Sequence, residues 1–157
     1  MPALTDAQRT LLATARRAVL ATLAPDGRAE LVPICYLVRE VPGNPGGLVV
    51  YSALDEKPKR VADPYQLSRV RNLVARPAVT LLVDHWAEDW ARLAWLRLEG
   101  LGQIVDPPPA GSPEPNEHGA AIAGLRERYP QYRTQRLEGR PLLRIAVTRV
   151  VAWSAAT

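Results

Sequence analysis

The chain contains one cysteine, Cys35, two histidines and no phenylalanine among its 157 residues. A single cysteine excludes an intrachain disulfide, and so few Cys and His residues make a poor ligand set for a metal such as zinc. No apolar run approaches the ~20 residues that a membrane-spanning helix needs. Residues 1–6 lack the basic start and the apolar core of a secretory signal. These absences predict a cytoplasmic protein that holds no metal and has no membrane partner.

Positive charge is in excess, since 20 Lys and Arg residues face 16 Asp and Glu residues, which gives a net charge of +4. Such a balance favours anionic ligands. Nucleic acid would also satisfy the charge, but we find neither a basic helix of a known type nor aromatic residues interleaved on a strand pair. We therefore expect a small anionic molecule as the partner rather than a nucleic acid.

Three cations, Lys57, Lys59 and Arg60, fall within four residues, directly after an apolar strand expected at 47–52. Cations crowded at the end of a buried strand repel one another unless an anion or solvent screens them. Phosphate is the usual anion at such a junction, because a helix N-terminus and Lys or Arg side chains converge there. The alternative is a solvated basic turn. Taken alone, this segment supports the two interpretations about equally.

Short segments rich in β-branched and apolar residues, separated by turn residues, predict a protein dominated by strands. The expected strands span residues 18–23, 30–38, 47–52, 78–83, 91–105 and 142–153, and the expected helices span 5–16, 63–76 and 116–129. Pro33 cannot donate to a strand ladder, so it marks an edge strand or a bulge. Most connections are too short for helical crossovers, so the strands should pair antiparallel and close, at least partly, into a barrel.

Several short segments, none specific alone, occur in an order and spacing that is fairly specific together. They are residues 21–23 with 26–28, 31–35, 50–53, 57–60, 71–73, 81–86 and 88–93. On these segments nearly the whole chain resembles the FMN-binding split β-barrel proteins of the pyridoxamine 5′-phosphate oxidase-like superfamily, in the branch of probable coenzyme F420-dependent enzymes. The resemblance implies a mainly β (α+β) fold, an antiparallel split β-barrel with two or three short helices, as a single domain over residues 1–157.

The resemblance also implies a cofactor site. Val32, Pro33, Ile34 and Cys35 would lie along the flavin or deazaflavin ring, Tyr51, Ser52 and Ala53 would flank the ribityl chain, and Lys57, Lys59 and Arg60 would hold the phosphate. It further implies a homodimer with the cofactor at the subunit interface, where His85, Trp86 and Trp90 would reach the cofactor of the partner subunit. It identifies no catalytic residue.

Two cofactors remain open at this point. FMN ends in one phosphate, whereas coenzyme F420 carries a phosphodiester and a polyglutamate tail and needs a longer positive groove. Arg69, Arg71, Arg136 and Arg140 would extend the positive surface beyond the basic turn, so the charge favours F420, with FMN as the alternative.

We therefore expect an oxidoreductase that uses reduced F420 or FMN for hydride transfer to a small conjugated substrate. The alternative is a non-catalytic protein that binds or carries flavin, F420 or haem. For Cys35 we expect a small buried apolar residue without a fixed cation beside it. For His85 we expect a structural hydrogen-bonding role rather than that of a proton donor.

Overall fold

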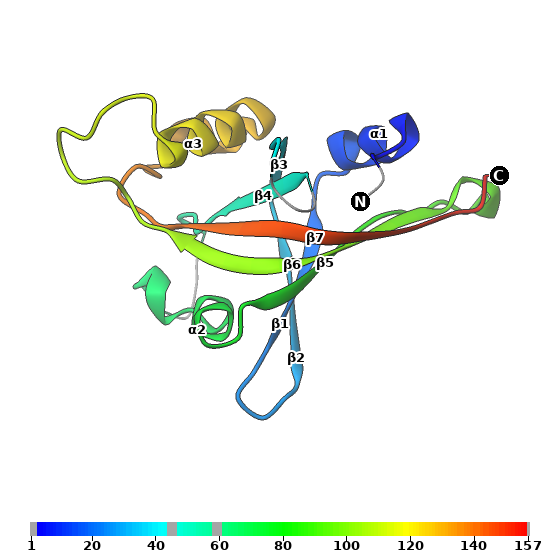
Figure 1. Cartoon of the computed structure of the whole chain (residues 1–157), viewed down its shortest axis with the longest axis horizontal. Coiled ribbons are helices and arrows are strands. Elements are labelled where there is room, and N and C mark those ends of the chain that lie inside the picture. The colour runs from blue at the N-terminus through cyan, green and yellow to red at the C-terminus, as the bar shows by residue number, and fades with distance from the viewer. Residues whose placement is uncertain (1–2, 44–46, 58–60, 157) are drawn as a thin grey trace.

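The computed structural model describes residues 3–43, 47–57 and 61–156. Within them, strands pair antiparallel into one seven-stranded sheet in the order β2-β1-β5-β6-β7-β4-β3 (Figure 1). The strands are β1 (Ala18–Leu23), β2 (Ala29–Ile34), β3 (Leu37–Glu40), β4 (Leu48–Ala53), β5 (Ala78–His85), β6 (Ala94–Val105) and β7 (Leu142–Ser154). The mainly β (α+β) fold predicted from the sequence is confirmed.

Closure of the sheet explains one difference from the sequence prediction. We expected a single strand over residues 30–38, but the structure divides it into β2 and β3, which lie at opposite ends of the strand order. In a flat sheet these two edges would stand ~29 Å apart, whereas the three-residue step from Ile34 to Leu37 spans at most ~10 Å. The sheet must therefore curl until its edges meet, as in a split barrel. Pro33 lies on the edge strand β2, as predicted.

The barrel interior and a second layer share strand β4. Leu20, Leu81 and Ile145 fill the interior together with Val50 of β4. On its other face β4 packs Val49 against the second cluster, beneath helix α3 (Glu117–Arg128). Because alternate residues of a strand point to opposite faces, β4 is buried along its whole length.

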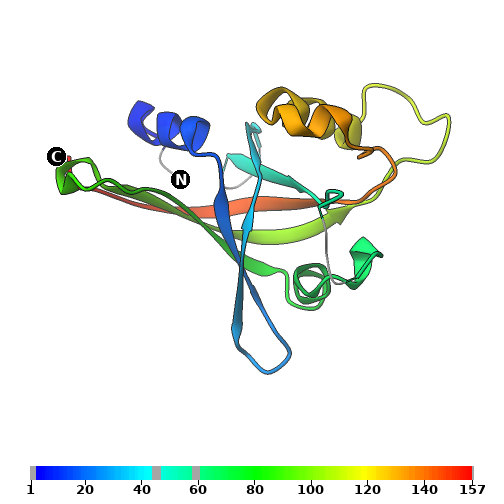
Figure 2. The ribbon, with the colours of Figure 1, turned by 180° about the vertical axis from the view of Figure 1, so that it is seen from behind.

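The helices begin near the positions that their capping residues predict. Helix α1 (Asp6–Thr14) has the capping box of Thr5 and Gln8, although it ends before residue 16. Asn116 caps α3, as expected. Asp63 caps only a 3₁₀ turn, η1 (Pro64–Gln66), because the backbone leaves the helical region at Leu67, and helix α2 spans Ser68–Ala75. Helices α1 and α3 lie on one side of the sheet and α2 on the other (Figure 2).

Strands β5, β6 and β7 continue past the barrel as a long arm, which we call the β-arm (Figure 1). Its tip holds the β5–β6 connection, including the 3₁₀ turn η2 (Trp90–Arg92), and lies close to the C-terminus. Trp86 and Trp90 at this tip are 66% and 69% exposed. No helix among the described residues is long and apolar enough to span a bilayer.

Candidate functional site

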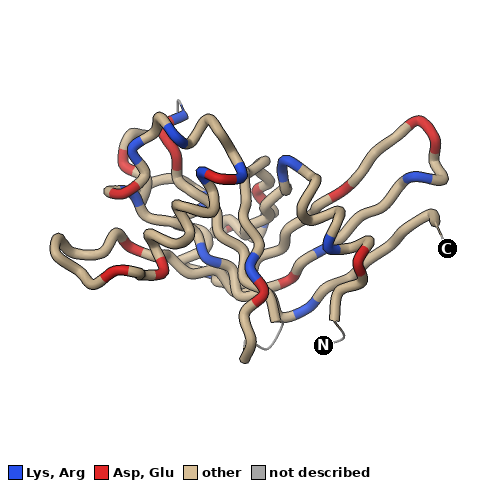
Figure 3. The backbone as a smooth tube through the Cα atoms, turned by 90° about the horizontal axis from the view of Figure 1, so that it is seen from above, with Lys and Arg blue, Asp and Glu red and all other residues tan. Residues whose placement is uncertain are grey.

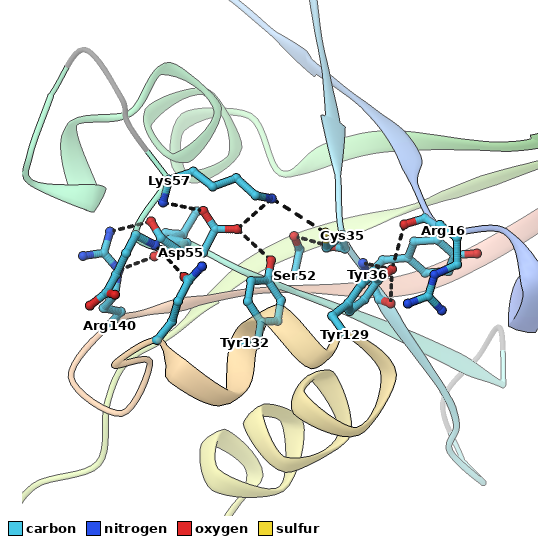
Figure 4. Close-up of polar contacts among 12 residues, drawn as sticks. Arg16, Cys35, Tyr36, Ser52, Asp55, Lys57, Tyr129, Tyr132 and Arg140 are labelled. Carbon is cyan, nitrogen blue, oxygen red and sulfur yellow. Dashed lines mark hydrogen bonds and ion pairs between the residues drawn. The ribbon is translucent and has the colours of Figure 1, made fainter.

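The loop that follows β4 is organised around a buried carboxylate, Asp55, which is only 5% exposed. The Lys57 backbone N–H donates to Asp55 Oδ1 over 3.2 Å, and Lys57 Nζ lies 3.1 Å from Asp55 Oδ2. From the other side, the hydroxyl of Tyr132 donates to Asp55 Oδ2 over 2.7 Å (Figure 4). Tyr132 belongs to the 3₁₀ segment η3 (Pro130–Thr134), which follows α3. One side chain therefore ties the end of a barrel strand to the helical layer.

Cys35 and Ser52 join this group. Ser52 Oγ donates to the carbonyl oxygen of Cys35 over 2.7 Å, and Lys57 Nζ lies 3.8 Å from Cys35 Sγ. Cys35 packs against the second apolar cluster, as a small apolar residue would. It is half-buried rather than fully buried, however, and a cation does stand beside it, so the expectation is wrong on these two points. The structure thus brings together Cys35, Ser52 and Lys57, three of the predicted site residues, although they come from separate segments.

The environment favours the protonated forms of Tyr132 and Lys57. Burial raises the pKa of the Tyr132 hydroxyl far above its usual value, and the hydrogen bond to Asp55 adds to this effect. Partial burial by itself would lower the pKa of Lys57, but the hydrogen bond and charge of Asp55 raise that pKa overall. At neutral pH, therefore, a neutral phenol and an ammonium group both face the Asp55 carboxylate.

A hollow of about 510 Å³ opens between β2 and α2. Val32 of β2 lines one wall, and Arg69 and Arg71 of α2 line the other. Glu30 also lines the hollow, and its carboxylate accepts a hydrogen bond from Asn72 over 3.0 Å. A hollow of this size is typical of small-molecule and cofactor sites.

Arg69 is the unusual residue of this hollow. Its Nε atom is buried and has no hydrogen-bond partner among the described residues. Burial lowers the pKa of its guanidinium group, and the negative charge of Asp55 partly opposes that effect. A buried donor without a partner costs free energy, and the same residue is one of those that line the hollow.

Other predicted site residues point elsewhere. The Tyr51 hydroxyl donates to Glu117 Oε1 over 2.6 Å beneath α3, and Ala53 packs in the same cluster. Both side chains lie on the face of β4 opposite to Ser52, because side-chain direction alternates along a strand. Ile34 belongs to the barrel core, and Pro33 is exposed on β2. Lys59 and Arg60 lie outside the described residues.

His85 and Trp86 lie at the tip of the β-arm, far from the cluster around Asp55 and Lys57. Ala53 pairs with Leu142, at the end of β7 that neighbours Val105 of β6, whereas His85 pairs with Ala94 at the other end of β6. Those two ends of β6 are ~36 Å apart at the usual rise of a strand. Within one chain these side chains do not reach the Lys57 cluster, so a role near a cofactor requires a second copy of the chain.

The four arginines that were expected to extend the positive surface behave differently from one another. Arg69 and Arg71 line the hollow. Arg140 instead donates from Nε to the carbonyl of Leu54 and from Nη2 to that of Asp55 over 3.1 Å, so it supports the loop from behind. Arg136 is exposed on the loop after η3. Over the described residues, basic and acidic segments are interspersed rather than gathered on separate faces (Figure 3).

Sequence reasoning missed Asp55 and Tyr132. An acidic residue just before the basic residues at 57–60 was a usable indication for Asp55, because cations so close together in the sequence need a counter-charge. Nothing local pointed to Tyr132, which lies 77 positions away in the sequence. Among the described residues no group of three or more His, Cys, Asp or Glu side chains could hold a metal ion.

Comparison with known proteins agrees with this architecture. The family model for pyridoxamine 5′-phosphate oxidase matches residues 4–154. The chain therefore belongs to the pyridoxamine 5′-phosphate oxidase family, the class of split-barrel proteins that its fold defines. Among curated proteins none matches the chain significantly.

Solved structures of the same fold include proteins with different names. A conserved hypothetical protein from Mycobacterium tuberculosis superimposes with a TM-score of 0.68 at 21% identity, covering 98% of this chain and 86% of that one. An F420 reductase gives a TM-score of 0.60 at 19% identity and coverages of 94% and 98%. The haem storage protein HutZ from Vibrio cholerae gives a TM-score of 0.62 at 15% identity, covering 98% of this chain and 95% of that one. At these identities the likeness establishes the shared fold alone.

Proposed function

We propose that this chain is an oxidoreductase that binds coenzyme F420, with FMN as the alternative cofactor, for hydride transfer to a small conjugated substrate. The observation that carries the proposal is the buried, unpartnered Nε of Arg69, a residue that lines the hollow beside Val32. A guanidinium that lacks a hydrogen-bond acceptor within the chain favours an anionic ligand. The anionic ligand that the family resemblance implies is a planar redox cofactor with a phosphate.

The residues present fit such a cofactor. Arg69 and Lys57 would bind the phosphate through charge-assisted hydrogen bonds, which are roughly twice as strong as neutral ones. Val32 and Cys35 would lie along the ring system, and Ser52 would flank the ribityl chain, as the family resemblance implies. The pairing of Arg69 with Arg71 along one wall of the hollow favours the longer anionic tail of F420 over FMN.

The cofactor and the protein have separate roles in this proposal. The bound cofactor supplies the redox chemistry, while the protein binds, orients and shields it. Lys57 and Arg69 neutralise the anionic end, and the apolar wall at Val32 and Leu67 keeps water from the ring. The proposal retains a homodimer, in which His85 and Trp86 of a second copy approach the site, and a cytoplasmic location.

The alternative is a protein that binds flavin, F420 or haem without turnover. It draws support from the fold shared with a haem storage protein. The two functions differ in one measurable property, which is whether the reduced cofactor is consumed in the presence of an acceptor.

The test begins with titration of the pure protein with F420, FMN and haem, followed by cofactor fluorescence or, for haem, absorbance. We expect saturable binding of F420 and weaker binding of FMN. Reduced F420 is then incubated with enones, quinones or biliverdin. Tight binding without turnover above background would favour the carrier, and no saturable binding of F420 or FMN would reject the proposal.

A further inference from the structure

Asp55 is a carboxylate in a place where an anion is expected to bind. It is 5% exposed and lies 3.1 Å from the ammonium of Lys57. Its charge also acts on the Arg69 guanidinium, and Arg140 donates to its carbonyl oxygen. A carboxylate repels phosphate, so its position among these cations calls for an explanation other than simple attraction of the ligand.

The carboxylate cannot turn away when a ligand arrives. Tyr132 holds Oδ2 at 2.7 Å and the Lys57 backbone N–H holds Oδ1 at 3.2 Å, so both oxygens are fixed by groups of the fold. A phosphate oxygen that accepts a hydrogen bond from Lys57 Nζ lies ~3 Å from that atom. It therefore stands within ~6 Å of the Asp55 carboxylate as long as the Lys57–Asp55 contact persists.

The hydrogen bonds from the Lys57 N–H and the Tyr132 hydroxyl do not by themselves require a charged residue here. An asparagine has the same shape and supplies an oxygen acceptor for the Lys57 N–H, and its amide can donate to the Tyr132 hydroxyl. What only the aspartate supplies is a full negative charge. That charge penalises each unit of negative charge on the ligand, so its effect depends on how many units the ligand brings.

We propose that Asp55 is a specificity-determining residue, which selects a singly charged phosphodiester over a doubly charged phosphomonoester at the Lys57–Arg69 site. The inference rests on the proposed function, and it names the feature by which this chain distinguishes F420 from FMN. The phosphodiester of F420 carries one negative charge at this point, whereas the terminal phosphate of FMN approaches two at neutral pH, since its second pKa is ~6.

The expected size of the effect follows from Coulomb's law. At ~6 Å, even with the dielectric constant of bulk water, one pair of unit charges changes an equilibrium constant about threefold. Two units on the ligand change it about tenfold. Asp55 should therefore weaken F420 binding about threefold and FMN binding about tenfold, which amounts to an about threefold preference for the diester.

The experiment measures dissociation constants of F420, FMN and riboflavin for the wild type and for Asp55→Asn at low ionic strength. We expect the variant to bind FMN about tenfold more tightly, F420 about threefold more tightly, and riboflavin, which has no phosphate, without change. Glu127→Gln on the exposed side of α3 changes the net charge equally and should leave all three constants unchanged. Tyr132→Phe keeps the carboxylate charge and should leave the ratio of FMN to F420 affinity unchanged.

The outcomes separate this inference from the proposed function. If the wild type binds F420 or FMN but Asp55→Asn leaves their ratio unchanged or shifts riboflavin equally, the role of Asp55 is wrong and the cofactor site stands. If the wild type binds neither cofactor, the proposed function is wrong and the role of Asp55 is rejected with it. Circular dichroism and a melting curve of Asp55→Asn establish that a change in affinity is not the result of unfolding. If Asp55→Asn does not fold, Tyr132→Phe decides the matter, because a changed ratio in that variant contradicts a selection made by charge.

Discussion

Two arginines, Arg128 and Arg69, show opposite uses of the same side chain. Arg128 of α3 donates to the carbonyl oxygens of Ala13 over 2.7 Å and Leu12 over 3.2 Å and also to that of Ala15. Its guanidinium lies 4.7 Å from the centre of the Tyr36 ring. Arg69 of α2 has a buried Nε with no partner among the described residues. The first arginine is satisfied by the fold and the second is not.

The difference separates a structural contact from a binding site. A guanidinium carries five N–H donors, and burying a donor without a partner costs about 1–3 kcal/mol. Arg128 avoids this cost by closing the C-terminal end of α1, where helix carbonyls lack partners of their own. Arg69 does incur the cost of a buried donor without a partner, and it lines a hollow of about 510 Å³ that a ligand could fill. We refer to the Arg128 group, with Tyr36 and Tyr129, as the helix latch.

The largest effect is expected for Arg128→Met. It removes charge-assisted bonds to the end of α1, and water replaces only part of them, so the free energy of unfolding should fall by about 3 kcal/mol. Urea denaturation measures it, with the exposed Arg133→Met as the control. Affinity for F420 should remain unchanged in the folded variant. A loss of affinity without a loss of stability would reverse the assignment of the two arginines.

The second-largest effect is expected at alkaline pH, where the helix latch should lose the stabilisation that Tyr36 contributes to folding. Burial raises the pKa of Tyr36 from 10 to about 12, and Tyr36 is 1% exposed. A raised pKa means that the folded state holds the proton more tightly, so this stabilisation is complete below pH 10 and is lost as the pH rises through 12. The loss approaches 2–3 kcal/mol, at about 1.4 kcal/mol per pKa unit.

Denaturation at several pH values between 9 and 12 tests this prediction. Tyr36→Phe is the reference, since it loses the hydrogen bond from the Tyr36 hydroxyl to the Leu12 carbonyl at every pH but does not titrate. The difference in unfolding free energy between wild type and variant should shrink over that interval. A constant difference would contradict the prediction.

Arg69→Met should act on binding instead of stability. Loss of a charged hydrogen-bond donor should weaken F420 binding by about 2–3 kcal/mol. The free energy of unfolding should stay the same or rise, because the variant removes a buried donor that has no partner. Fluorescence titration and urea denaturation on the same samples give both values, with Arg149→Met as the control, since Arg149 is exposed on β7, three strands from β1 in the sheet. Lower stability with unchanged affinity would make Arg69 a second structural arginine.

The smallest effect is expected for Lys57→Ala. Its side chain is 60% exposed, so the loss of F420 affinity should be near the lower end for a charged hydrogen bond, about 1.5 kcal/mol. Raising the salt concentration should reduce the difference between wild type and variant, because exposed charges are screened. An unchanged affinity would move the anion site away from the loop after β4.

Local patterns were sufficient for most of the fold. The boundaries of β1 were predicted from its apolar run and its turn, and the capping boxes and N-caps placed the starts of α1 and α3. The division between β2 and β3 was missed, because the apolar pattern runs on through Cys35 while the chain passes from one sheet edge to the other. Three of the predicted site residues lie together. Cys35, Ser52 and Lys57 meet, but the side chains of Tyr51 and Ala53 belong to the layer under α3.

Composition and periodicity alone determined that this protein is a mainly β chain with an excess of positive charge and a basic turn after a buried strand. Only the tertiary structure decided which cations the fold uses for itself and which it leaves unpaired. The physical reason is the separation in sequence between the groups that interact. Strand alternation and helix capping depend on neighbours a few residues apart, whereas satisfaction of a buried charge depends on groups that meet only when the barrel closes. Tyr132 reaches Asp55 across 77 positions and Arg128 reaches Ala13 across 115, and no local pattern reports such contacts.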